Sequence, residues 1–216
     1  DITPPAEMAG CAQAFKHRIG SRPVVVCAST REKDGVDEAA LLLQAWKRYH
    51  GDALLVIVPR HPERFQTAYD MARQYGFSVQ KRSDNEPVST DTQIWIGDSM
   101  GELFGYYLAA DVAFVGGSLV ETGCQNVIEP IACGVPTLFG PSVYNFKAAC
   151  EGAVEAGAAK QVFSADEWYD IVAGWLADPN LRQPYADQTQ KFVKQHRGAS
   201  QRMAEKMARV MGAESV

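Results

Sequence analysis

Short, uninterrupted apolar runs constrain the fold of this chain more than any other feature. Residues 23–27 (Pro-Val-Val-Val-Cys) and 53–58 (Ala-Leu-Leu-Val-Ile-Val) are polar on neither face. A short run of this kind predicts a strand that is covered on both sides, as in a parallel sheet between helices. No apolar run approaches the roughly 20 residues that a membrane-spanning helix needs.

Similar strand-sized runs recur and alternate with segments of helical character. The expected strands are residues 23–27, 53–58, 77–80, 94–96, 112–115 and 135–139. The expected helices are residues 6–15, 37–49, 64–75, 100–110, 127–133, 164–177 and 181–211, the last with a break at Gly198. Ser99 with Glu102 and Ser164 with Glu167 have the spacing of capping boxes, and Gly76 is an expected end cap. The alternation predicts an α/β fold, with a Rossmann-like parallel sheet and helices on both faces.

Composition narrows the class of protein. The chain has 216 residues and 46% hydrophobic content, enough for a sizeable core. Its net charge of −5 argues against a general nucleic-acid binder. The five cysteines are odd in number and form no Cys-x-x-Cys pair, which favours a reducing compartment over a disulfide framework or a zinc site. The first residues lack a basic flank and an apolar core, so no signal peptide is expected.

Polar and flexible residues stand where the expected strands end. In an open parallel sheet ligands bind beyond the carboxyl ends of the strands, so these residues are expected to gather at one edge. The hydroxyl donors there are Ser29, Thr30 and Ser118. The glycines that let a ligand approach backbone N–H groups are Gly101, Gly116 and Gly117. The helix starts that offer free N–H groups are Ser99 and Asn126.

Basic residues stand at the same edge. Arg31, Arg60 and Arg64 carry fixed positive charge, and His61 adds a donor. In an acidic chain this local group predicts an anionic small ligand, such as a phosphate or a carboxylate.

Several of these residues have an alternative, structural interpretation. Gly116 and Gly117 fit a tight turn as well as a ligand loop. Glu129, three residues after Asn126, fits a capping partner as well as an acceptor of ribose hydroxyl groups. A solvent-exposed helix start is favoured for Arg64. Helix caps are favoured for Ser99 and Glu102, and a core position is favoured for Cys124.

Several chemistries find no support. The chain has no P-loop spacing, no Gly-x-Gly-x-x-Gly fingerprint and no Gly-x-Ser-x-Gly nucleophile elbow. Its four histidines lack metal-ligand spacing, and there is no Asp-x-Asp triplet. We therefore expect a metal-independent protein with no cofactor.

Five stretches together resemble one known family. They are Ala-Ser-Thr-Arg-Glu at 28–32, Pro-Arg-His-Pro-Glu-Arg at 59–64, Asp-Ser-Met-Gly-Glu-Leu at 98–103, Gly-Gly-Ser-Leu-Val at 116–120, and the Asn-to-Glu-Pro stretch at 126–130. In this order they resemble the C-terminal half of the 3-deoxy-D-manno-octulosonic acid (Kdo) transferases, which are GT-B glycosyltransferases. The resemblance implies a domain that binds the donor CMP-Kdo. It also implies an enzyme of lipopolysaccharide biosynthesis that transfers Kdo to lipid A precursor at the cytoplasmic face of the bacterial inner membrane.

The resemblance also implies roles for individual residues. Arg60 would meet the anionic groups of the donor with His61 beside it, and the turn at Met100 and Gly101 would lie along the cytidine. Ser118 and Asn126 would face phosphate or sugar, and Glu129 would hold the ribose hydroxyls. The full expected substrate-binding set is Ser29, Thr30, Arg31, Arg60, His61, Met100, Gly101, Glu102, Gly117, Ser118, Asn126 and Glu129.

The chain departs from the family pattern at two places. Residues 33–38 replace a shorter Gly-Glu-Glu stretch, and residues 123–126 read Gly-Cys-Gln-Asn where the family has Gly-Gly-His-Asn. The lost histidine puts donor specificity or activity in doubt.

The expected organisation has three parts. They are a linker with a leading helix (1–20), a Rossmann-like nucleotide-sugar-binding domain (21–180) and C-terminal helices (181–216). In the family an N-terminal domain binds the acceptor and supplies the catalytic base, and Asp1-Ile2 resembles the end of the linker from it. The chain itself is therefore expected to be soluble, to bind nucleotide and to transfer no sugar. Residues 201–211 are expected to dock on the N-terminal domain in preference to lipid. The alternatives are the donor half of another GT-B enzyme that uses a UDP-sugar, and a non-catalytic nucleotide-binding module.

Overall fold

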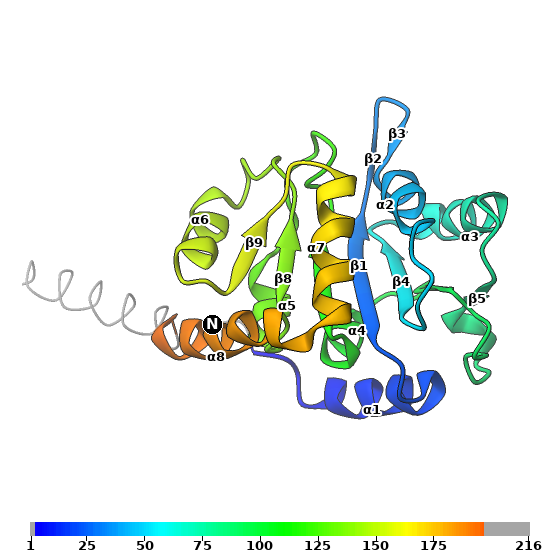
Figure 1. The fold of residues 1–216 in the computed structure, drawn as a ribbon, viewed down its shortest axis with the longest axis horizontal. Helices are drawn as coiled ribbons and strands as arrows, with labels where there is room; N and C mark the ends of the chain where they lie inside the picture. Colours follow the sequence, from blue (N-terminus) through cyan, green and yellow to red (C-terminus); the bar gives the residue numbers. More distant parts are fainter. Residues whose placement is uncertain (1–2, 197–216) are drawn as a thin grey trace, which may run out of the picture.

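The computed structural model describes residues 3–196 and contains a parallel sheet of seven strands in the order β5-β6-β4-β1-β7-β8-β9 (Figure 1). The strands are β1 (Val24–Thr30), β4 (Leu54–Pro59), β5 (Val79–Lys81), β6 (Ile94–Ile96), β7 (Val112–Val115), β8 (Thr137–Phe139) and β9 (Ala159–Gln161). The expected parallel α/β architecture is thus confirmed.

Helices cover both faces of this sheet because its strands are apolar on both sides. They are α1 (Glu7–Ile19), α2 (Glu38–Trp46), α3 (Phe65–Gln74), α4 (Leu103–Ala109), α5 (Ile128–Ala132), α6 (Lys147–Glu155), α7 (Ala165–Ala177) and α8 (Gln183–His196). Val25 and Cys27 of β1 pack in one core with α2, α3 and α7, and α7 lies in front of the sheet in Figure 1. Val24 and Val26 pack in a second core with α1 and α4. Successive residues of one strand therefore face opposite layers.

Three elements were not expected from the sequence. A hairpin of β2 (Glu32–Lys33) and β3 (Val36–Asp37) projects beyond the carboxyl end of β1 (Figure 1). Its turn places Asp34 and Gly35 at φ angles of 52° and 82°, which suit a tight hairpin. The edge strand β9 reads Ala-Lys-Gln and so lacks an apolar run, and α6 is the third unexpected element.

The expected helix ends are partly confirmed. The Ser164 hydroxyl accepts a hydrogen bond from the Glu167 N–H at 3.1 Å, and the Glu167 carboxylate accepts one from the Phe163 N–H. Gly76 ends the turn after α3 at a φ of 92°. The expected end of the last helix, with Gly198 and residues 201–211, lies outside the described residues.

The capping box expected at Ser99 and Glu102 is wrong. Helix α4 begins at Leu103, and the Ser99 hydroxyl is hydrogen-bonded to the Tyr106 hydroxyl at 2.8 Å. The Glu102 carboxylate pairs with Arg82 across the fold, so tertiary contacts override the local capping pattern.

The sheet order places a topological switch point between β1 and β7. From β1 the chain builds the sheet outward in one direction through β4, and later in the other direction through β7, β8 and β9. Ligands of open α/β sheets bind in the crevice outside such a point. None of the helices within residues 3–196 is long and apolar enough to cross a membrane.

Candidate functional site

Loops from four strands meet at the carboxyl edge of the sheet. The Gly116 N–H donates to the Ala28 carbonyl at 2.7 Å, which joins the ends of β7 and β1. The Arg60 N–H donates to the Thr30 carbonyl at 3.0 Å, which joins β4 to β1. The Gly97 N–H donates to a β4 carbonyl at 2.8 Å, which brings in the loop after β6. The edge beside the switch point is therefore one connected surface.

Two arginines present guanidinium groups at this edge. Arg60 is exposed, and its Nε donates to the Gln125 Oε1 at 3.2 Å. Arg31 is half-buried, and its guanidinium has no hydrogen-bond or ion-pair partner within residues 3–196. His61 is exposed beside Arg60. Arg64 differs, because it forms an ion pair with Asp37 that neutralises its charge.

Glu129 lies close to Arg60 and is half-buried. Burial raises the pKa of the Glu129 carboxyl, and the hydrogen bond from Asn126 and the charge of Arg60 oppose this rise. The Asn126 Nδ2 donates to Glu129 at 3.4 Å, while the Asn126 Oδ1 accepts from the Ile128 N–H at 3.1 Å. The two side chains contact each other directly, an arrangement that differs from a reciprocal capping box.

The glycine loop after β7 requires a correction. Its N–H groups were expected to approach a ligand, but the Glu38 carboxylate occupies them. The Gly117 N–H donates to Glu38 at 2.6 Å, the Ser118 N–H at 3.1 Å and the Leu119 N–H at 2.8 Å. With Gly116 bonded to β1, these loop N–H groups are already used within the protein.

The hydroxyl groups expected to contact a ligand are also buried. The Ser118 hydroxyl donates to the Val115 carbonyl at 2.6 Å and accepts from the Gly140 N–H at 2.7 Å. Ser118 has no exposed surface. Ser29 and Thr30 are 6% and 3% exposed. The structure therefore corrects the interpretation of these three residues as open hydroxyl donors, because the Ser118 hydroxyl is bonded within the protein and Ser29 and Thr30 are buried.

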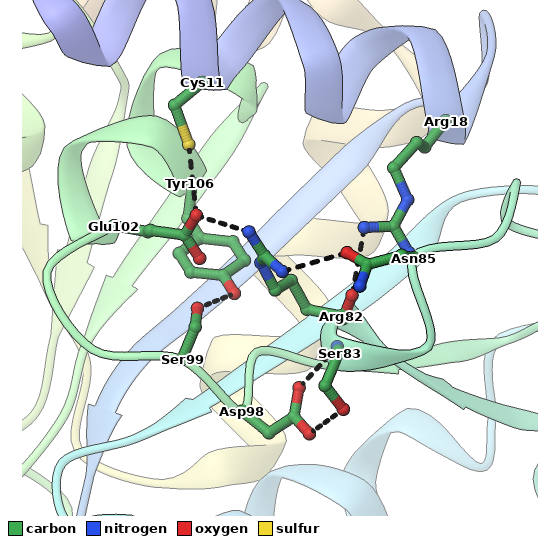
Figure 2. A network of polar contacts seen from close by, with 9 residues as sticks. All are labelled: Cys11, Arg18, Arg82, Ser83, Asn85, Asp98, Ser99, Glu102 and Tyr106. Atoms are coloured by element: carbon green, nitrogen blue, oxygen red, sulfur yellow. Dashed lines mark hydrogen bonds and ion pairs between the residues drawn. The ribbon is translucent and has the colours of Figure 1, made fainter.

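The loop after β6 is fixed at both ends, as Figure 2 shows. At one end the Asp98 carboxylate accepts from the Ser83 N–H at 2.9 Å. At the other end Glu102 pairs with Arg82 at 2.6 Å. Between them Gly101 has a φ of 79° and Met100 is 57% exposed. The loop thus presents the Met100 side chain at the edge.

Glu102 itself faces inward and is not open to a ligand. Its Oε1 also accepts a weak hydrogen bond from the Cys11 thiol at 3.8 Å (Figure 2). Burial acts to raise the pKa of Glu102, but the hydrogen bonds from Arg82 and Ser99 outweigh it and hold the pKa below its ordinary value. The expected substrate contact at Glu102 is therefore corrected. Glu102 instead forms an ion pair that joins the start of α4 to the turn at Arg82.

We expect Arg82→Ala to lower the free energy of unfolding by about 1–3 kcal/mol at pH 7, because a partly buried carboxylate loses its charged partner. The loss should shrink as the pH falls through the depressed pKa of Glu102, since the ion pair stabilises the fold only while Glu102 is ionised. Urea unfolding at pH 7 and near pH 3 measures both effects. Lys147→Ala is the control, since it removes an exposed pair with Glu151 and should change stability by less than about 0.5 kcal/mol. Equal losses in both variants would contradict the role of the ion pair between Arg82 and Glu102.

The sequence did not predict that Glu38 binds the loop after β7. Glu38 stands first in α2 directly after an exposed hairpin, so nothing in its local sequence signals burial. Gln125, which bonds to Arg60, was noted only as the residue that replaces the family histidine. A side chain that bonds to a loop about 80 positions away leaves no local pattern.

Comparison with known proteins identifies the family of the chain. The family model for glycosyl transferases group 1 matches residues 13–192. The chain belongs to the group 1 glycosyl transferases. Within this family it is 38% identical over 185 residues to the 3-deoxy-D-manno-octulosonic acid transferase of Bordetella pertussis. It is 37% identical over 184 residues to the enzyme of the same name from Haemophilus influenzae. Each match covers 84% of the chain but only 43% of the relative, so this group 1 domain spans less than half the length of these relatives.

Solved structures show which domain of such a transferase the chain is similar to. The C-terminal CMP-Kdo binding domain of WaaA from Acinetobacter baumannii superposes with a TM-score of 0.79 at 31% identity, and the match covers 87% of this chain and 98% of that domain. The chain is therefore similar to that domain over nearly its whole length. WaaG, a glycosyltransferase of lipopolysaccharide biosynthesis, shares the fold at a TM-score of 0.60 and 15% identity.

Proposed function

We propose that this group 1 glycosyl transferase domain binds the nucleotide sugar CMP-Kdo for an enzyme that transfers Kdo in lipopolysaccharide biosynthesis. The observation that carries the proposal is the pair of guanidinium groups of Arg31 and Arg60 at the switch point of an acidic chain, where neither is in an ion pair within residues 3–196. CMP-Kdo carries a phosphate and a sugar carboxylate, and guanidinium groups bind both in bidentate geometry. The similarity to the WaaA domain over 98% of that domain supports the choice of donor.

The remaining roles follow from which side chains stay open. Arg31 and Arg60 both bind the phosphate, Arg60 also meets the sugar carboxylate, and His61 adds a donor beside them. Glu129, held by Asn126, accepts hydrogen bonds from the ribose hydroxyls, and the exposed Met100 beside Gly101 packs along the base. In this proposal five residues of the expected set lie beneath the loops and do not contact the donor. They are Ser29, Thr30, Glu102, Gly117 and Ser118.

In this proposal the chain supplies neither the acceptor site nor the catalytic base that sugar transfer requires. The partners of the chain are the nucleotide-sugar donor, an N-terminal domain that binds the acceptor, and lipid A precursor through that domain. The full enzyme acts at the cytoplasmic face of the bacterial inner membrane. Donor binding is metal-independent in this proposal, and within residues 3–196 no group of three His, Cys, Asp or Glu side chains is arranged to hold a metal ion.

Isothermal titration with CMP and UDP tests the proposal. We expect CMP to bind with a dissociation constant of about 1 mM or lower, and UDP to bind more weakly. Absence of heat at millimolar CMP would overturn the proposal. Tighter binding of UDP would favour the donor domain of a different GT-B glycosyltransferase.

A further inference from the structure

The Glu38 carboxylate is a buried anion whose partners are all backbone N–H groups. The residue has no exposed surface, and within residues 3–196 it has no ion-pair partner. Its Oε2 accepts from the Gly117 N–H at 2.6 Å and from the Arg31 N–H at 3.3 Å. Its Oε1 accepts from the Ser118 N–H at 3.1 Å and the Leu119 N–H at 2.8 Å. Consecutive N–H groups turned toward one point form a concavity that suits an anion, and here the protein fills it with its own side chain.

These four hydrogen bonds join the two loops that flank the switch point. One loop follows β1 and carries Arg31, and the other follows β7 and carries Gly117. The Glu38 N–H also donates to the Arg31 carbonyl at 2.9 Å, so Glu38 holds the Arg31 backbone through both its main chain and its side chain. The Arg31 side chain then runs along the β7 loop, since a Cβ atom on Gly117 would stand only 3.4 Å from the Arg31 Cδ. The direction of the Arg31 guanidinium therefore depends on where Glu38 holds both loops.

We infer that Glu38 is a positioning residue of the donor site, an internal anion that fixes the β7 loop against Arg31 so that the guanidinium faces the donor. Glu38 does not touch the donor. This inference rests on the proposed function, since it specifies how one of the two binding cations is held in place.

The charge state of Glu38 supports this role. Burial raises the pKa of Glu38 to about 7, while the N–H groups of Leu119, Gly117, Arg31 and Ser118 oppose the rise. The titratable groups that face it are the Cys27 thiol of β1 and the Cys124 thiol. Protonation would place an O–H group among N–H donors, and at least one N–H would then lose its acceptor. The loops are thus held most firmly when Glu38 is ionised.

Stability and loop order should respond to pH in opposite directions. The pKa of Glu38 is raised in the folded state, so its contribution to stability falls as the pH rises from its ordinary pKa of 4.5 to about 7. The order of the loops increases as Glu38 ionises in the folded protein, at pH values around 7. This opposition separates a positioning role from a purely stabilising one.

A measurement without ligand tests the contact itself. We expect the amide-proton NMR signals of Gly117, Ser118 and Leu119 in the wild-type chain to shift together with pH, with a midpoint near the raised pKa of Glu38. The same signals in Glu38→Gln should not titrate. Signals that stay constant across this range in the wild type would overturn the inference, whether or not CMP binds.

A CMP titration tests the consequence for the site. Glu38→Gln should bind CMP about tenfold more weakly than wild type at pH 8 while remaining folded, because it places an amide NH₂ against N–H donors. The ratio of the two affinities should approach one as the pH falls to 6, since wild-type Glu38 is then largely protonated. The phosphate of CMP titrates in both proteins and cancels in this ratio.

The variants and controls keep the outcomes distinct. Glu63→Gln changes an exposed carboxylate near the same edge and should bind CMP as wild type does. If Glu38→Gln fails to fold, Glu38→Asp replaces it, and its shorter side chain should weaken CMP binding because it cannot reach both loops. A folded Glu38 variant with wild-type CMP affinity would overturn the inference. Failure of the wild type to bind CMP would overturn the proposed function and leave the NMR titration to decide the contact.

Discussion

Gly116→Ala should reduce the free energy of unfolding by about 3 kcal/mol or more, the upper range for overpacking a closed site. A Cβ atom at this position would stand 2.6 Å from the Ser29 carbonyl oxygen and 2.7 Å from the Thr30 nitrogen. Both contacts are backbone atoms at the end of β1, so relief requires β1 and β7 to separate at the switch point. Urea unfolding followed by circular dichroism measures the loss.

Gly174→Ala is the matched control for this substitution. Gly174 lies in α7, and a Cβ atom there would meet nothing within 4 Å. Alanine is the better helix former, so this variant should gain about 0.5–1 kcal/mol of stability. Similar stabilities of the two alanine variants would show that the close approach of the β1 backbone is not the reason for a glycine at position 116.

The double variant Arg31→Ala/Arg60→Ala should weaken CMP binding by about 30-fold or more. Each single variant should cost about 1–3 kcal/mol of binding free energy, the usual range for a hydrogen bond to a charged group. The melting temperature should change little, because neither guanidinium forms an ion pair within residues 3–196. Titration calorimetry with CMP at low salt, combined with thermal unfolding, measures both quantities.

Arg48→Ala controls for the loss of positive charge. Arg48 pairs with Asp170 at 2.9 Å and stacks on Tyr169, on the part of the fold where α2 meets α7. Removing it changes the net charge by the same amount as one site arginine but should leave the CMP affinity unchanged. An equal loss of affinity in all the arginine variants would point to a general charge effect and count against a local anion site.

The sequence predicted the layered fold well because its signals are local. Apolar runs such as residues 53–58 define strands, and the Ser164 cap defines the start of α7. Elements with weak local signals were missed for the same reason. Strand β9 pairs only with β8 at the edge of the sheet and reads Ala-Lys-Gln, which no strand pattern favours.

The candidate site was predicted less completely. Whether a polar group is available to a ligand depends on hydrogen-bond partners that lie far away in the sequence. Arg31 and Arg60 stand at the expected edge, and within residues 3–196 neither guanidinium is in an ion pair. Ser118 looked like a donor to a ligand, yet its hydroxyl is shared between Val115 and Gly140. Glu102 looked like a helix cap, yet it pairs with Arg82.

The sequence by itself determined the alternation of strands and helices and the residues that follow each strand. These depend on apolar spacing and turn residues, which act over a few positions. Only the tertiary structure decided that Glu38 occupies the N–H groups of the β7 loop, about 80 positions away, and so which groups remain for a ligand. Burial and hydrogen-bond partners are set by contacts between distant segments, so the availability of a donor is a property of the fold.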